Sequence, residues 1–175
     1  MRVINVEIKA RCHHPDRVRN LLRSRQARFA GLDHQVDTYF CVREGRLKLR
    51  EGNIENSLIS YRRGNQATPK TSDVLLYAVK PDPGLKEILS RVFGVLAVVD
   101  KQREIYYVEN IKFHIDTVEE LGSFVEIEAA GDEQSDQASL LEQCRDYMRQ
   151  FAVAEPDLIA ESYSDMVLML KRKGA

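Results

Sequence analysis

Charged and apolar residues alternate along the N-terminal segment NVEIKAR, residues 5–11. Glu7, Lys9 and Arg11 take every second position, and Val6, Ile8 and Ala10 lie between them. Because successive side chains of a β-strand point to opposite faces, this pattern predicts a strand with a small apolar face and a charged face. The same alternation returns in RLKLR, residues 46–50, after a turn at Glu44-Gly45.

Further extended segments follow at spacings typical of hairpins. They are expected at residues 28–43, 57–63, 72–80, 98–110, 111–118 and 123–129. Helical spacing of apolar residues predicts helices after His14-Pro15, between Asp82-Pro83 and Gly94, and after Ser135, with a last apolar stretch to Leu170. We therefore predict an α+β fold, an antiparallel sheet of about eight strands that can close into a barrel, with flanking helices.

Length and composition are those of one domain, so we expect residues 1–175 to form a single unit. The formal net charge is −1, so the overall charge does not attract the chain to nucleic acid or to an anionic membrane. Cys12, Cys41 and Cys144 are widely spaced and include no CxxC pair, which argues against a disulfide scaffold and a zinc site. The N-terminus lacks the apolar core of a signal peptide, and no apolar run is long enough for a membrane span. We therefore expect a cytoplasmic protein.

The charged positions of six predicted strands form a larger set. They are Glu7, Lys9, Arg11, Lys48, Arg50, Arg62, Lys101, Arg103, Asp116, Glu126 and Glu128, with Lys70 in a loop. On any one strand, alternating charge usually means a face in contact with water. Taken together, the same residues could line a tunnel that binds a polyanion and its metal. The sequence alone leaves both interpretations open.

A triphosphate group would suit such a tunnel. Arginine offers planar, bidentate donors to phosphate oxygens, and lysine supplies point charges. Carboxylates would repel the same ligand unless a hard divalent cation such as Mg²⁺ lay between them. Acidic residues among basic ones therefore indicate a bound metal.

Six short segments together resemble the strand motifs of the CYTH superfamily, which includes class IV adenylate cyclases, thiamine triphosphatases and inorganic triphosphatases. They are VEIKAR (6–11), GRLKLR (45–50), ISYRR (59–63), KQREIYYV (101–108), FHID (113–116) and LGSFVEIE (121–128), and the match continues to ESYSDM (161–166). Each motif is weak by itself, but their order and spacing cover nearly the whole chain. The resemblance implies an eight-stranded antiparallel tunnel, the triphosphate tunnel fold.

The resemblance also implies roles for individual residues. The implied phosphate ligands are Lys9, Arg11, Lys48, Arg50, Arg62, Lys70, Lys101 and Arg103, with Lys9, Lys101 and Arg103 the candidates for catalysis. The implied ligands of Mg²⁺ or Mn²⁺ are Glu7, Asp116, Glu126 and Glu128. One position departs from the family pattern: Asn5 stands where the first glutamate of the N-terminal signature is expected. Because an amide carries no charge, a second metal would be held less firmly there.

Within the superfamily, KQREIYYV, LGSFVEIE and ESYSDM resemble the class IV cyclase branch most. This implies conversion of ATP to 3′,5′-cyclic AMP and pyrophosphate, and a homodimer. Two alternatives stay open: hydrolysis of tripolyphosphate or thiamine triphosphate, and a non-catalytic protein that binds nucleotide or polyphosphate. His114 is expected to be structural. Asp37 could border the site, but a lone acid in a strand is usually solvated, and we expect the latter.

Overall fold

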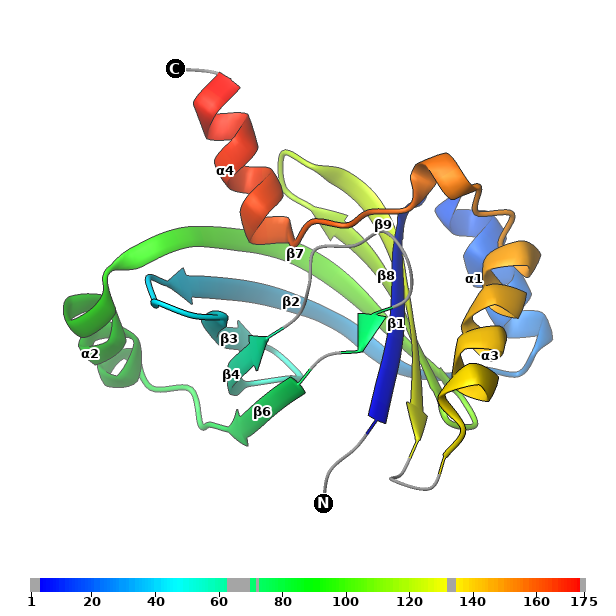
Figure 1. The fold of residues 1–175 in the computed structure, drawn as a ribbon, viewed down its shortest axis with the longest axis horizontal. Helices are drawn as coiled ribbons and strands as arrows, with labels where there is room; N and C mark the ends of the chain where they lie inside the picture. Colours follow the sequence, from blue (N-terminus) through cyan, green and yellow to red (C-terminus); the bar gives the residue numbers. More distant parts are fainter. Residues whose placement is uncertain (1–3, 63–69, 72, 132–134, 174–175) are drawn as a thin grey trace.

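One antiparallel sheet organises the computed structural model (Figure 1). The structure describes residues 4–62, 70–71, 73–131 and 135–173. Within these ranges the strands are β1 (Ile4–Arg11), β2 (Arg28–Phe40), β3 (Arg46–Gly52), β4 (Ser57–Arg62), β5 (Lys70–Thr71), β6 (Asp73–Ala78), β7 (Val95–Val108), β8 (Ile111–Val118) and β9 (Gly122–Gly131). The predicted α+β fold with an antiparallel sheet is confirmed, with eight longer strands and the two-residue β5 among the described residues.

The sheet curls so that its two edges approach each other (Figure 1). Its order is β5-β1-β9-β8-β7-β2-β3-β4-β6, and every described pairing is antiparallel. β5 pairs with β1 at one edge, and β6 pairs with β4 at the other. Because a single residue separates β5 from β6 in the chain, the two edges come together there. The curled sheet thereby acquires a concave face.

Helices α1 (Pro15–Ser24) and α3 (Gln137–Gln150) cover the convex face of β1, β8 and β9 (Figure 1). The main apolar core lies between these two helices and the sheet. It contains Val6, Ile8, Phe113, Ile127 and other apolar residues of these strands. The apolar half of the alternation in β1 therefore packs against helices. Its charged half faces the concave side.

The other two helices lie toward the opposite end of the sheet. Helix α2 (Pro83–Phe93) packs Leu89 against Phe40 and Leu49. After a short 3₁₀ turn (Glu155–Asp157), α4 (Tyr163–Lys173) packs Tyr163 and Val167 against the sheet. No helix within the described ranges is both long and apolar enough to cross a membrane.

Local signals explain where the helices begin and end. Asp82 caps α2 by accepting a hydrogen bond from the Gly84 backbone N–H, and Gly94 ends the helix with a φ of 74°. Helix α3 is capped by Asp136, whose carboxylate accepts from two backbone N–H groups, and not by the expected Ser135. A carboxylate at this position also interacts favourably with the helix dipole.

Candidate functional site

A cavity of about 490 Å³ lies on the concave face of the sheet. The edge strand β6 and strands from β1 to β4 across the sheet contribute to its wall. Its charged and polar lining comprises Glu7, Lys9, Tyr39, Lys48, Arg50, Glu55, Asn56, Ser57, Tyr61, Lys101, Arg103, Lys112, His114, Glu126, Glu128, Ser162 and Tyr163. Its apolar lining comprises Ile54, Ile59, Val74, Leu76 and Ala78. The charged face of the strands is therefore the lining of a cavity.

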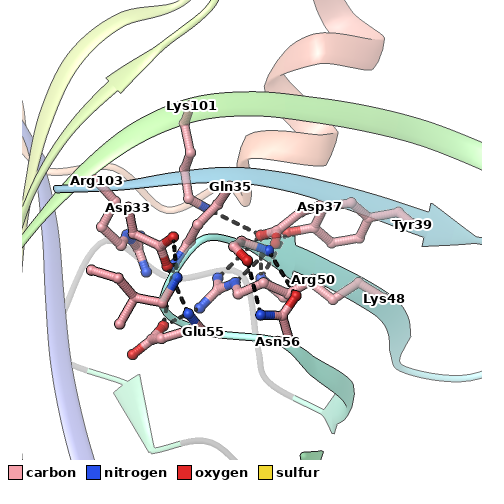
Figure 2. Close-up of polar contacts among 12 residues, drawn as sticks. Asp33, Gln35, Asp37, Tyr39, Lys48, Arg50, Glu55, Asn56, Lys101 and Arg103 are labelled. Atoms are coloured by element: carbon pink, nitrogen blue, oxygen red, sulfur yellow. Dashed lines mark hydrogen bonds and ion pairs between the residues drawn. The ribbon is translucent and has the colours of Figure 1, made fainter. Parts of the chain in front are cut away.

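A buried carboxylate organises one group of cations (Figure 2). Asp37 on β2 is inaccessible to solvent and accepts hydrogen bonds from Lys48 Nζ at 2.7 Å and Lys101 Nζ at 2.8 Å. Arg50 binds the same carboxylate with Nε at 2.9 Å and Nη2 at 3.1 Å. Three basic side chains from β3 and β7 thus converge on one acid.

Burial makes these lysines unusually easy to deprotonate. It lowers the pKa of Lys101 to about 7, with Arg103 and Arg50 contributing and Asp37 opposing the shift. Burial likewise lowers the pKa of Lys48 to about 8. Burial disfavours the charged form of Asp37 as well, but Arg50, Lys101 and Lys48 hold its pKa well below the usual range. The cluster carries a net positive charge that an anion would stabilise.

Arg103 lies at the boundary between the basic and acidic parts of the cavity. Its Nε donates to Asp116 Oδ1 at 2.7 Å, and its Nη2 donates to Glu126 Oε2 at 2.8 Å. The Tyr163 hydroxyl donates to Asp116 Oδ2 at 2.8 Å from the start of α4. Asp116 is fully buried and lies behind Arg103, so it positions the guanidinium.

The acidic part of the cavity could hold a divalent cation. One ligand atom from each of His114, Glu126 and Glu128 lies within 4.8 Å of the others, and Glu7 is the direct cross-strand partner of Glu128. Among the described residues, the Nε2 atom of buried His114 has no hydrogen-bond partner, and the Nδ1 atom of the same ring lies 3.1 Å from Glu126 Oε2. Lys9 Nζ lies 3.2 Å from Glu126 Oε1. Carboxylate oxygens with one imidazole are a donor set that fits a metal such as Mn²⁺.

The structure brings most of the predicted site residues together. Those lining the cavity are Glu7, Lys9, Lys48, Arg50, Lys101, Arg103, Glu126 and Glu128, with Asp116 buried directly behind Arg103. Lys70 pairs with Glu7 through the backbone in β5, and its side chain lies outside the described part of the structure. Asn5 pairs with Ala130, and its side chain is likewise outside that part.

Two predicted phosphate ligands lie elsewhere. Arg62 is on the outer face of β4, where its side chain is 71% exposed and pairs with Glu44. The inward residues of that strand are Ser57, Ile59 and Tyr61, so the prediction for Arg62 is wrong because the alternation was assigned to the wrong face. Arg11 shares the face of Lys9 but is exposed at the end of β1, where it packs over the Phe124 ring outside the cavity lining.

Sequence reasoning missed several lining residues. Lys112 and His114 alternate with Asp116 along β8, so the spacing that identified Asp116 could also have identified them. Asp37 was interpreted as solvated, yet it lies at the centre of the cation cluster. Glu55 lies in the turn between β3 and β4, where no periodicity marks a side chain as inward.

Comparisons with known proteins agree with this architecture. A CYTH domain family model matches residues 3–163. The chain is 25% identical over 173 residues to the Methanocaldococcus jannaschii protein "Putative adenylate cyclase MJ0240", covering 94% of this chain and 98% of that protein. The PH1012 protein of Pyrococcus horikoshii OT3 has a similar structure, with a TM-score of 0.80 and 24% identity, covering 92% of this chain and 98% of that one.

A plant protein extends the same structural similarity. HpAC1 from Hippeastrum superimposes with a TM-score of 0.64 and 14% identity, and the match covers 97% of this chain and 96% of that one. At such identities these two structures share the fold with the present chain. Because the family model spans most of the sequence, including every strand that lines the cavity, the chain belongs to the CYTH domain family.

Proposed function

We propose that this protein is a metal-dependent enzyme that binds ATP in the concave cavity and converts it to 3′,5′-cyclic AMP and pyrophosphate. The observation that carries the proposal is the convergence of six basic side chains in one cavity beside four glutamates. The basic residues are Lys9, Lys48, Arg50, Lys101, Arg103 and Lys112. A triphosphate concentrates several negative charges over a short distance and therefore matches such a lining.

The apolar part of the lining supports a substrate that is larger than inorganic tripolyphosphate. Ile54, Ile59, Val74 and Leu76 line the cavity from β4, β6 and the turn before β4. Ligand sites commonly combine an apolar wall with a few placed polar groups. A nucleoside attached to the triphosphate would use this wall, whereas a bare polyphosphate has no group to place there.

The proposed metal ligands are Glu7, Glu126, Glu128 and His114. A bound Mg²⁺ or Mn²⁺ would neutralise charge on the phosphate oxygens. The chain's own cations would hold the triphosphate so that the ribose 3′-oxygen lies in line with the α-phosphorus. Lys9, Lys101 and Arg103 would then stabilise the negative charge that develops on the leaving pyrophosphate.

A second candidate is hydrolysis of a triphosphate, in which water attacks the terminal phosphorus. HpAC1 is described as an adenylyl cyclase but has a dominant triphosphatase activity. It shares the fold of this chain. Both reactions use the same positioning of the triphosphate. A non-catalytic binding protein is the third alternative, since Asn5 is uncharged and stands where the resemblance expects the first glutamate of the N-terminal signature.

The reaction is tested by incubating the protein separately with ATP, tripolyphosphate and thiamine triphosphate in the presence of Mg²⁺ or Mn²⁺. Products are separated by chromatography. Cyclic AMP and pyrophosphate from ATP support the cyclase, and orthophosphate supports the triphosphatase. Binding without product supports the non-catalytic alternative, and the absence of binding to all three ligands overturns every one of these functions.

The metal is tested by a separate measurement. The loss of the Mn²⁺ electron paramagnetic resonance signal reports binding of the ion to the protein. Glu128→Gln should weaken Mn²⁺ binding by about tenfold, because it removes one charged ligand. Glu119→Gln, an exposed change outside the cavity lining, is the control. Equal Mn²⁺ affinities in both variants would show that Glu128 is not a ligand of the metal.

The homodimer implied by the resemblance is also a proposal. The end of α2 and the start of β7 expose Ile88, Val92, Val95, Leu96 and Val98. Exposed apolar side chains close together are typical of protein interfaces. Sedimentation equilibrium tests this expectation, and a monomer at micromolar concentration would contradict it.

A further inference from the structure

A carboxylate from the turn between β3 and β4 extends into the cavity and joins two cations. Glu55 Oε1 accepts a hydrogen bond from Lys112 Nζ at 2.6 Å. Its Oε2 accepts from Arg50 Nη1 at 3.0 Å and from Gln35 Nε2 at 3.2 Å (Figure 2). Lys112 and Arg50 come from β8 and β3, which are separated in the sheet by β7 and β2. The Glu55 side chain therefore bridges β8 and β3 above the concave face.

The fold determines the position of this carboxylate. The buried carboxylate of Asp33 accepts hydrogen bonds from the backbone N–H groups of Ile54 at 2.8 Å and Glu55 at 3.0 Å (Figure 2). The turn approaches Gly52 so closely that an added Cβ would lie 2.7 Å from the Glu55 carbonyl oxygen. A side chain at position 52 is therefore excluded, and Glu55 is presented to Lys112 and Arg50 by a tightly held turn.

The charges around Glu55 are those of an anion-binding site in which a carboxylate is already bound. Partial burial opposes ionisation of Glu55, but Lys112 and then Arg50 lower its pKa to about 2. Two cations on opposite sides of a carboxylate, each bound to a different oxygen, can receive the oxygens of a phosphoryl group in the same way. Lys112 is also the cross-strand neighbour of Glu128, so the pair lies next to the proposed metal ligands.

We propose that Lys112 and Arg50 form a phosphoryl-binding subsite of the cavity, and that Glu55 occupies this subsite in the free protein as a competing anion. The inference rests on the proposed function, because it assumes that the cavity binds a triphosphate. Binding of the polyphosphate displaces the Glu55 carboxylate from the two cations. Glu55 therefore lowers the affinity for the substrate, and Lys112 raises it.

The two side chains thus have opposite predicted effects, and this separates a competing anion from a structural contact. Glu55→Gln keeps the shape of the side chain and removes its charge, so tripolyphosphate should bind more tightly, by on the order of tenfold. Lys112→Met should weaken binding by a similar factor. In the double variant, the gain from Glu55→Gln should be smaller, because one of the two released cations is missing.

The experiment is isothermal titration calorimetry of the full chain with tripolyphosphate at pH 7 without divalent metal. Glu51→Gln is the matched control, because Glu51 lies on the same strand–turn unit but pairs with Lys86 at 2.7 Å outside the cavity lining. It should leave the affinity unchanged. Thermal unfolding of each variant checks that it is folded. If Glu55→Gln does not fold, Glu55→Ala is used in its place.

The outcomes distinguish the subsite from the proposed function. Tighter binding by the Glu55 variant together with weaker binding by Lys112→Met supports the subsite. Unchanged or weaker binding by the folded Glu55 variant overturns it, while the wild-type affinity would still support a triphosphate site. If the wild-type protein binds neither tripolyphosphate nor ATP, the proposed function fails and the subsite fails with it.

Discussion

The carboxylate of Asp37 lies 2.8 Å from Lys101 Nζ, in a contact almost completely withdrawn from solvent. Lys48 and Arg50 bind the same carboxylate. A single buried acid therefore holds three cations at short distances in the free protein. Their mutual repulsion would otherwise favour deprotonation of the lysines or displacement of the side chains. Asp37 is thus a positioning residue for the basic part of the cavity.

Replacing Asp37 with asparagine should weaken triphosphate binding, although it removes a negative charge from the site. Without Asp37 the pKa values of Lys48 and Lys101 fall further, and fewer of the three cations remain charged at pH 7. We expect an affinity loss of about tenfold by calorimetry, and a loss of about 3–5 kcal/mol in the free energy of unfolding in urea. Tighter binding would mean that Asp37, like Glu55, is a competing anion.

Triphosphate binding should be accompanied by proton uptake near pH 8. The pKa of Lys101 is about 7 and that of Lys48 about 8, so both are partly neutral there. A bound polyanion favours the charged form and raises both pKa values, and affinity therefore falls as the pH increases from 7 to 9. Calorimetry in two buffers of different ionisation enthalpy measures the uptake. Lys101→Met should reduce it, and an unchanged proton count would contradict this assignment.

Arg103→Ala should affect stability as well as binding. The guanidinium is the partner of buried Asp116 and of Glu126, and its removal leaves both carboxylates without that charge. Breaking a buried ion pair costs about 3–5 kcal/mol, which should appear in urea unfolding at pH 7. The same measurement on Lys101→Met is the comparison, because Asp37 keeps Lys48 and Arg50 as partners there. Equal stability of Arg103→Ala and the wild type would show that Asp116 and Glu126 do not depend on Arg103.

Arg62→Ala should leave triphosphate affinity within about twofold of the wild-type value. The side chain points away from the cavity and forms an exposed pair with Glu44, and such pairs contribute about 0–1 kcal/mol to stability. Lys48→Met, which removes a cation from the lining of the cavity, should reduce the affinity by at least about tenfold. A large loss of triphosphate affinity in Arg62→Ala would show that Arg62 contributes to the binding site.

Local patterns were sufficient to predict much of the fold. The alternation in residues 5–11 and 46–50 predicted strands with one charged face, and Lys9, Lys48 and Arg50 lie in the cavity accordingly. Pro15 and the Asp82-Pro83 pair marked the starts of α1 and α2. These predictions succeeded because backbone geometry and capping act between residues that are close in the chain.

The tertiary structure alone decided which face of each strand is enclosed. A period of two separates two faces but does not say which one is inward, and for this reason Arg62 was misassigned while inward Ile59 and Tyr61 were not recognised. The sequence by itself determined the strands, the helices and the local charge of each face. Only the tertiary structure brought Asp37 to Lys101, through the pairing of β2 with β7, and Glu55 to Lys112, across the concave face, because these contacts join residues 64 and 57 positions apart in the chain.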